Sequence, residues 1–320
     1  MPGYDVGELS GKTALVTGAA GFIGSAVARR LQDAGAIVHG VSRMPRPGAE
    51  GCDRWWQADL TQLAEARRIL DAARPDLVFH LSGFVDGARR IELVMPMMQA
   101  NLVPVVNLLL AAADRGAAVR VLLAGSLEDA PAAGASPVPA SPYAAAKLAA
   151  GAYARMFHAL FGTATIWVRP FMVYGPGQRD IHRLVPYVIL SLLRREPPAL
   201  SSGTRLMDWI YIEDVAEAYL AAAVAKGVEG QALDVGCGNL VTVRSVVERL
   251  VQMIDPSVVP CFGAVPDRPF ERERVADVAA SAARMGWRPR VSLDEGLHRT
   301  VEWYRRNGFR PQDASKAGAR

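Results

Sequence analysis

The chain has 320 residues, of which 51% are hydrophobic and 21% are charged, and its formal net charge is only +4. This composition excludes an intrinsically disordered chain, a collagen-like chain and a small disulfide-rich scaffold. No run of five or more Lys or Arg residues occurs, so the sequence indicates no surface for nucleic acids.

Cysteine spacing and apolar stretches bear on where the protein works. The three cysteines form no CxxC or Cys/His pattern, so we expect neither a metal site nor a disulfide framework. Residues 1–10 lack the basic start and apolar core of a signal peptide. The longest apolar stretch, residues 102–113, is too short to span a bilayer. These features predict a cytoplasmic protein with no membrane partner.

Short apolar runs alternate with longer segments of helical period in the first half of the chain. Strands are predicted at residues 13–17, 37–41, 77–81, 119–124 and 165–168. Helices are predicted between them, at residues 22–34, 62–73, 96–115 and 142–160. Nearly all-apolar strands separated by helices are typical of a parallel sheet that is covered on both faces. The pattern predicts an α/β fold with a doubly wound, Rossmann-type parallel sheet.

The pattern changes after residue 170. Helices are predicted at residues 181–195, 213–226, 243–253 and 292–306, with strand-like pieces at 209–212 and 232–235. We expect a smaller C-terminal substrate lobe that interleaves with the sheet domain. The predicted dinucleotide-binding domain comprises residues 1–174 and 206–238. The substrate-binding lobe comprises residues 175–205 and 239–310, and residues 311–320 form a flexible tail.

A glycine-rich turn follows the first predicted strand and opens the first predicted helix. Its glycines are Gly18, Gly21 and Gly24, and the helix begins with Phe22 and Ile23. Glycines are needed where a pyrophosphate approaches the backbone closely, and the N–H groups of a helix N-terminus attract phosphates. The turn therefore predicts a dinucleotide-binding site; the alternative is a turn that is merely structural.

The end of the second strand bears on the choice of cofactor. NAD-binding domains typically carry Asp or Glu there to hold the ribose 2′-hydroxyl group, whereas this chain has Ser42 followed by Arg43. A guanidinium can pair with a 2′-phosphate that no carboxylate repels, so we predict NADP(H) as the cofactor. Asp59, followed by Leu60, is predicted either to bond the adenine or to cap the next helix.

Ser126, Tyr143 and Lys147 are the predicted catalytic residues. Ser126 ends the fourth strand, at the carboxyl edge where such sheets bind ligands. Lys147 lies one helical turn after Tyr143 on the same face, so its ammonium group should lower the pKa of the tyrosine hydroxyl. Tyr143 could then act as an acid or base near neutral pH, while Ser126 holds the substrate oxygen. The alternative is that the three residues are unrelated.

These motifs together resemble the extended short-chain dehydrogenase/reductases. The glycine turn, Ser126 and the Tyr143-x-x-x-Lys147 pattern match that family, and the resemblance continues through residues 169–178, 205–215, 267–271 and 285–289. It covers nearly the whole chain. It implies nucleotide-diphosphate sugar substrates, which family members epimerise, dehydrate, decarboxylate or reduce.

The resemblance also implies roles for single residues. Lys147 is expected to bind the nicotinamide ribose as well, with Tyr143 beside the cofactor. Arg205 and Arg268 are expected to reach the diphosphate of the sugar nucleotide, for which the forked donors of arginine are suited. Glu128 is expected either to contact the substrate or to lie on a loop surface. A homodimer is expected through the helices predicted at residues 96–115 and 142–160.

Two departures from the family pattern limit the choice of activity. Dehydratases carry an Asp-Glu pair after the residue that matches Ser126, whereas this chain has Leu127 and Glu128. We therefore do not expect 4,6-dehydration. Met172 stands where many members have an Asn that contacts the diphosphate, and a thioether cannot donate that hydrogen bond.

The resulting hypothesis is the NADPH-dependent reduction of a nucleotide-linked 4-keto sugar. Tyr143 would donate the proton, Ser126 would share that hydrogen bond and Lys147 would hold down the tyrosine pKa. The runner-up is a nucleotide-sugar 4-epimerase that retains its cofactor, because the same three residues can perform a transient oxidation. A third possibility is a non-catalytic NADP-binding regulatory protein.

Overall fold

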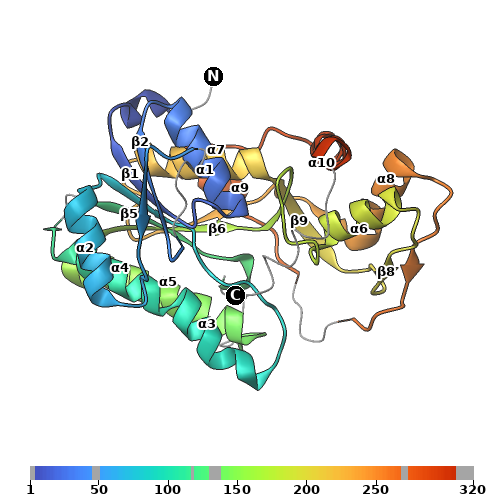
Figure 1. Cartoon of the computed structure of the whole chain (residues 1–320), viewed down its shortest axis with the longest axis horizontal. Coiled ribbons are helices and arrows are strands. Elements are labelled where there is room, and N and C mark those ends of the chain that lie inside the picture. Colours follow the sequence, from blue (N-terminus) through green and yellow to red (C-terminus); the bar gives the residue numbers. More distant parts are fainter. Residues whose placement is uncertain (1–3, 45–50, 117–118, 130–137, 268–272, 308–320) are drawn as a thin grey trace. The chain divides into compact units, whose positions relative to one another are not determined.

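The computed structural model describes residues 4–44, 51–116, 119–129, 138–267 and 273–307 (Figure 1). The chain divides into two compact units. Unit 1 consists of Met1–Pro170, Val215–Val235 and Asp277–Arg288, and unit 2 consists of Phe171–Asp214, Gly236–Ala276 and Pro289–Arg320.

A seven-stranded sheet forms the centre of unit 1 in its described residues. The strands are β1 (Thr13–Thr17), β2 (Ile37–Ser42), β3 (Arg54–Gln57), β4 (Leu77–His80), β5 (Arg120–Ala124), β6 (Ala164–Pro170) and β10 (Ala232–Val235). Their order is β10-β6-β5-β4-β1-β2-β3, and every pair is parallel. The prediction of a doubly wound parallel sheet is confirmed. The order reverses between β1 and β4, and open α/β sheets bind ligands at the carboxyl ends of the strands at such a point.

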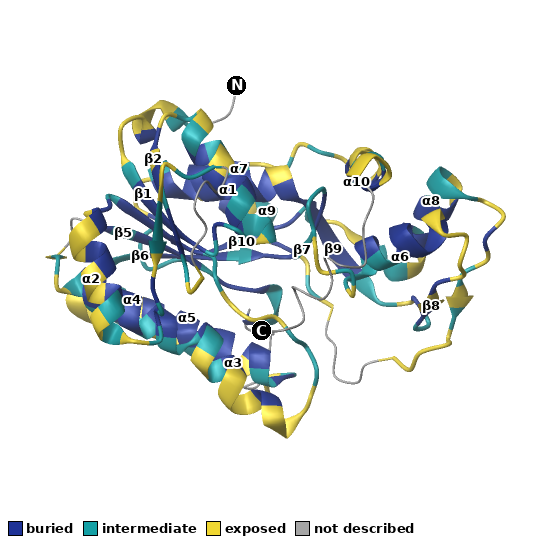
Figure 2. Ribbon diagram, viewed as in Figure 1, coloured by how far each residue is buried: buried dark blue, intermediate teal, exposed yellow. Residues whose placement is uncertain are grey.

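Helices cover both faces of this sheet (Figure 1). One face carries α1 (Phe22–Asp33), α7 (Ile212–Val224) and α9 (Val278–Met285); the other carries α2 (Leu63–Ala73), α3 (Val94–Asn101), α4 (Val103–Ala113) and α5 (Pro142–Phe161). The strands are therefore buried on both sides (Figure 2), which is why they are almost wholly apolar.

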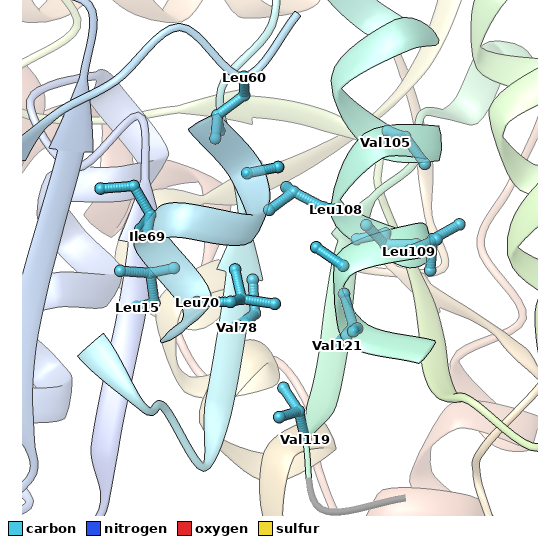
Figure 3. Packing of buried hydrophobic residues seen from close by; sticks show 14 of the residues in the cluster. Leu15, Leu60, Ile69, Leu70, Val78, Val105, Leu108, Leu109, Val119 and Val121 are labelled. Carbon is cyan, nitrogen blue, oxygen red and sulfur yellow. The ribbon is translucent and has the colours of Figure 1, made fainter. Parts of the chain in front are cut away.

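One hydrophobic core lies between the sheet and the helices α2, α4 and α5. Figure 3 shows Leu15, Val78 and Val121 from the strands against side chains of α2 and α4. Burial of one such side chain contributes about 1.5–3 kcal/mol, so this layer fixes the strands and the loops at their ends.

The helix predicted at residues 96–115 is in fact two helices, α3 and α4, which break at Leu102. Pro104 has no N–H group to donate to the carbonyl of Ala100, so the helical hydrogen bonds cannot continue through this point. The stretch Ile91–Ala113 as a whole has 23 residues and a mean hydropathy of 1.6, so by length and composition it could cross a membrane. Residues 102–113, which alone are too short to span a bilayer, are the second part of this stretch. The whole stretch is weak evidence for a membrane segment, because α4 buries Leu108 and Leu109 in the core of unit 1.

Unit 2 contains two small sheets in its described residues. Strands β11 (Leu240–Thr242), β9 (Leu206–Tyr211) and β7 (Met172–Tyr174) lie in that order, and β8 (Ala199–Leu200) pairs with β12 (Cys261–Phe262). Its helices are α6 (Leu184–Leu193), α8 (Val243–Ile254) and α10 (Leu293–Asn307).

The observed units differ from the predicted domains at three elements. Strand β7 falls in the predicted dinucleotide-binding domain, but it belongs to unit 2. Strand β9 was assigned to the dinucleotide-binding domain, but it pairs with β7 and β11 within unit 2. Helix α9 falls in the predicted substrate lobe, but it packs on β10 in unit 1, where Ser281 Oγ donates to the carbonyl of Asp234 at 2.8 Å. The predicted tail, residues 311–320, lies outside the described residues, which end with helix α10 at Asn307.

Candidate active site

The glycine turn brings the start of α1 against the strand ends at the reversal of the sheet. Gly18 has φ +68°, and a Cβ there would lie 2.8 Å from the Ser82 nitrogen. A Cβ on Gly24 would collide with the Gly18 carbonyl oxygen, and Gly21 is the N-cap of α1 without a capping side chain. No acidic residue stands in the first helical turn, which includes Phe22 and Ile23. A glycine cradle at an uncapped helix N-terminus fits the pyrophosphate of a dinucleotide.

At the end of β2, Ser42 is half-buried and Arg43 is exposed. The Ser42 hydroxyl donates to the carbonyl of Met44 and accepts a hydrogen bond from Trp55 Nε1 at 3.2 Å. Gln57 Nε2 donates to the Arg43 carbonyl at 3.0 Å. Neighbouring side chains from β3 thus hold this strand end, while the Arg43 side chain extends into solvent. Sequence reasoning missed Trp55 and Gln57, whose only signal was an aromatic pair in a polar segment.

Asp59 forms a local turn before α2. Its Oδ1 accepts hydrogen bonds from Thr61 N at 3.0 Å and from Thr61 Oγ1 at 2.9 Å. Helix α2 itself begins after Gln62, so Asp59 orders the approach to the helix rather than capping it. The side chain of Leu60 lies in the core of unit 1, and its carbonyl accepts from Asn107 Nδ2 at 2.9 Å. Adenine binding by Asp59 and Leu60 stays a prediction.

Ser126 follows β5 and begins a tight turn into the 3₁₀ helix Leu127–Asp129. Its Oγ accepts the backbone N–H of Glu128 at 3.2 Å. The Glu128 carboxylate in turn accepts from Ser141 Oγ at 3.3 Å, and Ser141 is the N-cap of α5. Glu128 therefore ties the Ser126 turn to the start of the helix that carries Tyr143. Its contact with substrate stays a prediction.

Tyr143 and Lys147 are both buried on α5. The Lys147 ammonium lies 5.9 Å from the centre of the Tyr143 ring and donates to the Ala124 carbonyl at 2.8 Å. Because Ala124 ends β5 two residues before Ser126, this bond anchors Lys147 beside the Ser126 turn. Burial lowers the pKa of Lys147 to about 8, although the charge of Asp129 opposes that shift.

Asp129 and Trp167 are residues that sequence reasoning missed. Asp129 is buried, and its Oδ2 accepts hydrogen bonds from Ser126 N at 2.7 Å and from Trp167 Nε1 at 3.1 Å. Burial raises the pKa of this carboxyl to about 6, against the two hydrogen bonds and the charges of Arg169 and Lys147. A single acidic residue in a loop gives no sequence signal for such a site.

A second missed group lies at the ends of β1 and β4. Thr17 Oγ1 lies 2.9 Å from His80 Nδ1 and donates to Ser82 Oγ at 3.0 Å. Burial, and then the charge of Lys147, lower the pKa of His80 to about 3, so the imidazole is neutral at physiological pH. This neutral group shapes the strand ends without adding a second cation near Lys147.

The predicted diphosphate contacts fall elsewhere in the chain. Arg205 lies in unit 2 just before β9, and its carbonyl accepts from Val243 N at 2.9 Å. Met172 is half-buried at the start of β7. Arg268 lies outside the described residues. The substrate roles of the two arginines stay predictions.

Comparison with known proteins matches this geometry to one family. The profile described as the NAD dependent epimerase/dehydratase family matches residues 14–236. A UDP-glucose 4-epimerase of Mycolicibacterium smegmatis is 32% identical, over 91% of this chain and 98% of the relative. A dTDP-glucose 4,6-dehydratase of Neisseria gonorrhoeae is 30% identical, over 95% of this chain and 98% of the relative.

A solved structure supports the same family assignment. MoeE5, in complex with UDP-glucuronic acid and NAD, is 31% identical and superposes with a TM-score of 0.81 over 92% of this chain and 99% of its own. The resemblance to extended short-chain dehydrogenase/reductases is thus confirmed. The chain belongs to the NAD-dependent epimerase/dehydratase family and is an enzyme of the nicotinamide-dependent oxidoreductase type.

Proposed function

We propose that this enzyme uses NADPH in the cytoplasm to reduce the 4-keto group of a sugar linked to a nucleotide diphosphate. The relatives named for UDP-glucose and dTDP-glucose support a nucleotide sugar, and both of their names specify position 4. The family assignment favours an enzyme over the non-catalytic regulator.

The residues at the end of β2 favour net reduction over epimerisation. Ser42 provides no carboxylate to repel a 2′-phosphate, and Arg43 extends an exposed guanidinium there. A reductase must exchange its spent cofactor after each turnover, whereas an epimerase regenerates its cofactor on the same substrate. A site that selects NADPH therefore favours net reduction.

The buried residues of α5 supply the proton for this reaction. The glycine turn and Lys147 would hold NADPH, which would supply the hydride for the carbonyl carbon. The Tyr143 hydroxyl transfers its proton to the carbonyl oxygen as negative charge develops there, which completes the alcohol. Ser126 donates a hydrogen bond to the same oxygen. The Lys147 ammonium beside the ring stabilises the tyrosinate that remains until solvent returns the proton.

A 4-epimerase is the second candidate, because a 4-epimerase is among the relatives at 32% identity. MoeE5 was solved with NAD, which also fits a retained cofactor. We would distinguish the two by incubating the protein with NADPH and a panel of nucleotide-linked 4-keto-6-deoxysugars, and separately with NAD⁺ and UDP-glucose. Stoichiometric loss of NADPH with a new 4-hydroxy sugar by NMR supports reduction. Interconversion of UDP-glucose and its 4-epimer without net reduction of NAD⁺ would replace it with epimerisation.

We expect NADPH to bind at least about tenfold tighter than NADH, a difference of about 1.4 kcal/mol. Arg43→Ala should remove most of this preference, because its guanidinium is the proposed partner of the 2′-phosphate. Titration of both cofactors by fluorescence measures it. Arg54→Ala is the matched control, since the Arg54 guanidinium stacks 3.8 Å from the centre of the Trp56 ring and should not affect the preference. Equal affinities in the unmutated protein would contradict the NADPH assignment.

We also propose a homodimer that forms through helices of unit 1. Helix α5 exposes Leu148, Tyr153, Leu160 and Phe161, although it also covers the sheet. Large exposed apolar side chains on one helix are typical of a subunit interface. Light scattering at micromolar concentration should give twice the chain mass. A monomer would mean that these helices serve only to cover the sheet.

A further inference from the structure

One buried carboxylate near the site has no part in the mechanism described above. Asp129 is 7% exposed and stands three residues after Ser126. Its Oδ2 accepts both the Ser126 backbone N–H at 2.7 Å and the Trp167 indole N–H at 3.1 Å. A buried carboxylate is costly unless it is hydrogen-bonded and faces a positive charge, so this placement requires an explanation.

Two glycines, Gly125 and Gly151, leave space for the Trp167 indole beside Asp129. A Cβ on Gly125 would collide with Trp167 Nε1 and lie 2.9 Å from Asp129 Oδ2. A Cβ on Gly151 of α5 would lie 3.1 Å from Trp167 Cε2. The indole is therefore packed between the end of β5 and α5, with its N–H directed at Asp129. The Asp129 carboxylate therefore holds the Ser126 backbone, while the Trp167 indole fixes the position of that carboxylate.

Two buried cations act on Asp129, and one of them has its own partner. Arg169 Nε donates to Asp234 Oδ1 at 2.7 Å, and both side chains are largely buried. Lys147 donates instead to the neutral carbonyl of Ala124. Asp129 binds the backbone of Ser126, two residues after Ala124, so its carboxylate lies at the same strand end as the Lys147 ammonium. At this place each group favours the charged form of the other.

We propose that Asp129 is a positioning residue for the active site: its carboxylate fixes the backbone of Ser126 and supplies the negative charge that faces the Lys147 ammonium. The residue touches neither substrate nor cofactor in this role. The inference rests on the proposed functions of Ser126, Tyr143 and Lys147.

The groups around the pair decide how activity should depend on pH. Lys147 is faced by neutral His80 from β4, by Tyr143 on its own helix and by Asp129. Asp129 is faced in addition by Arg169 from β6 and by the uncharged hydroxyl of Tyr219 from α7. Loss of the negative charge at Asp129 would make it easier for Tyr143 and Lys147 to lose a proton. Any property that requires these protons should then fail at a lower pH.

The test is Asp129→Asn, which keeps the shape and an acceptor oxygen but removes the charge. NADP⁺ affinity, measured by fluorescence without substrate, should be lost on the alkaline side at least about half a pH unit earlier than in the unmutated protein. With a substrate found by the panel, kcat should fall by about tenfold while KM for NADPH changes much less, and the alkaline limb of kcat should shift in the same direction.

Asp234→Asn is the matched control, because it also neutralises a largely buried carboxylate of unit 1, but one that pairs with Arg169. In this variant NADP⁺ affinity and kcat should decline on the alkaline side at the same pH as in the unmutated protein. If NADP⁺ affinity and kcat of Asp129→Asn also decline at the same alkaline pH as in the unmutated protein, Asp129 is a structural residue only and the proposal is overturned.

A second variant covers the case of an Asp129→Asn protein that does not fold. Trp167→Phe keeps most of the ring volume but removes the N–H bond that holds the Asp129 carboxylate in place. The Ser126 backbone should then be less well fixed, so kcat should fall by about tenfold while KM for NADPH changes much less. A kcat like that of the unmutated protein would overturn the proposal. Tyr143→Phe separates the two proposals: if that variant turns over normally the reductase mechanism fails, whereas the shift in NADP⁺ binding tests Asp129 regardless.

Discussion

Tyr143→Phe should lower kcat by about 10²–10⁴-fold, because the alkoxide that develops during reduction would lose its proton donor. The change removes only a hydroxyl group from a ring that packs with Leu93, Met97 and Ala146, so the fold should survive. The loss should appear in kcat more than in KM, since the interaction strengthens as charge develops on the substrate oxygen. Steady-state kinetics on the substrate identified by the panel, together with NADPH titration, measure both effects.

The same helix offers a control for this substitution. Tyr153 is 41% exposed on α5, so Tyr153→Phe makes the same chemical change away from the site and should leave kcat near normal. Near-normal turnover in Tyr143→Phe with NADPH still bound would show that Tyr143 is not the acid. The reductase mechanism would then fail, although the family assignment would stand.

The parts of the site that local sequence determines were predictable. The glycine turn is encoded by steric demands at single positions: Gly24 must lack a Cβ because the Gly18 carbonyl occupies that space. Tyr143 and Lys147 are four residues apart on one helix, so their proximity follows from helical geometry. The apolar strands of the parallel sheet were predictable because both faces are buried.

Features that depend on distant partners could not be predicted in this way. The Asp129–Trp167 hydrogen bond joins residues 38 positions apart, and neither residue shows a local pattern that requires the other. Strand β3 was missed because it lies at the sheet edge, has no fully buried residue and has exposed polar residues, Arg54 and Gln57, at its two ends. The break at Leu102 was missed because the apolar pattern continues through it, although Pro104 gave a signal that could have been used.

Lys147→Met should abolish most activity while leaving the protein folded. Methionine fills a similar volume but carries no charge, so the Tyr143 pKa would rise and its proton would be harder to transfer to the substrate. We expect kcat/KM to fall by at least about 100-fold, which is about 2.7 kcal/mol of transition-state stabilisation. NADPH should bind about tenfold more weakly because the proposed ribose contact is lost. Kinetics and cofactor titration measure the two effects, and Lys226→Met, at an exposed position after α7, is the control.

The pH dependence of stability gives this substitution a readout that does not depend on substrate. Burial lowers the pKa of Lys147 in the folded protein to about 8, below its ordinary value of 10.5. Between these values the unfolded chain binds the proton more tightly, so the free energy of unfolding of the unmutated protein should rise from pH 8 to pH 10 by about 2 kcal/mol from this group. Lys147→Met should lack that rise. Its stability at neutral pH should change little, because removal of the buried charge is offset by an Ala124 carbonyl that loses its donor. Parallel stability curves for the two proteins above pH 8 would mean that Lys147 is not a buried ammonium, and its proposed action on Tyr143 would then lack a physical basis.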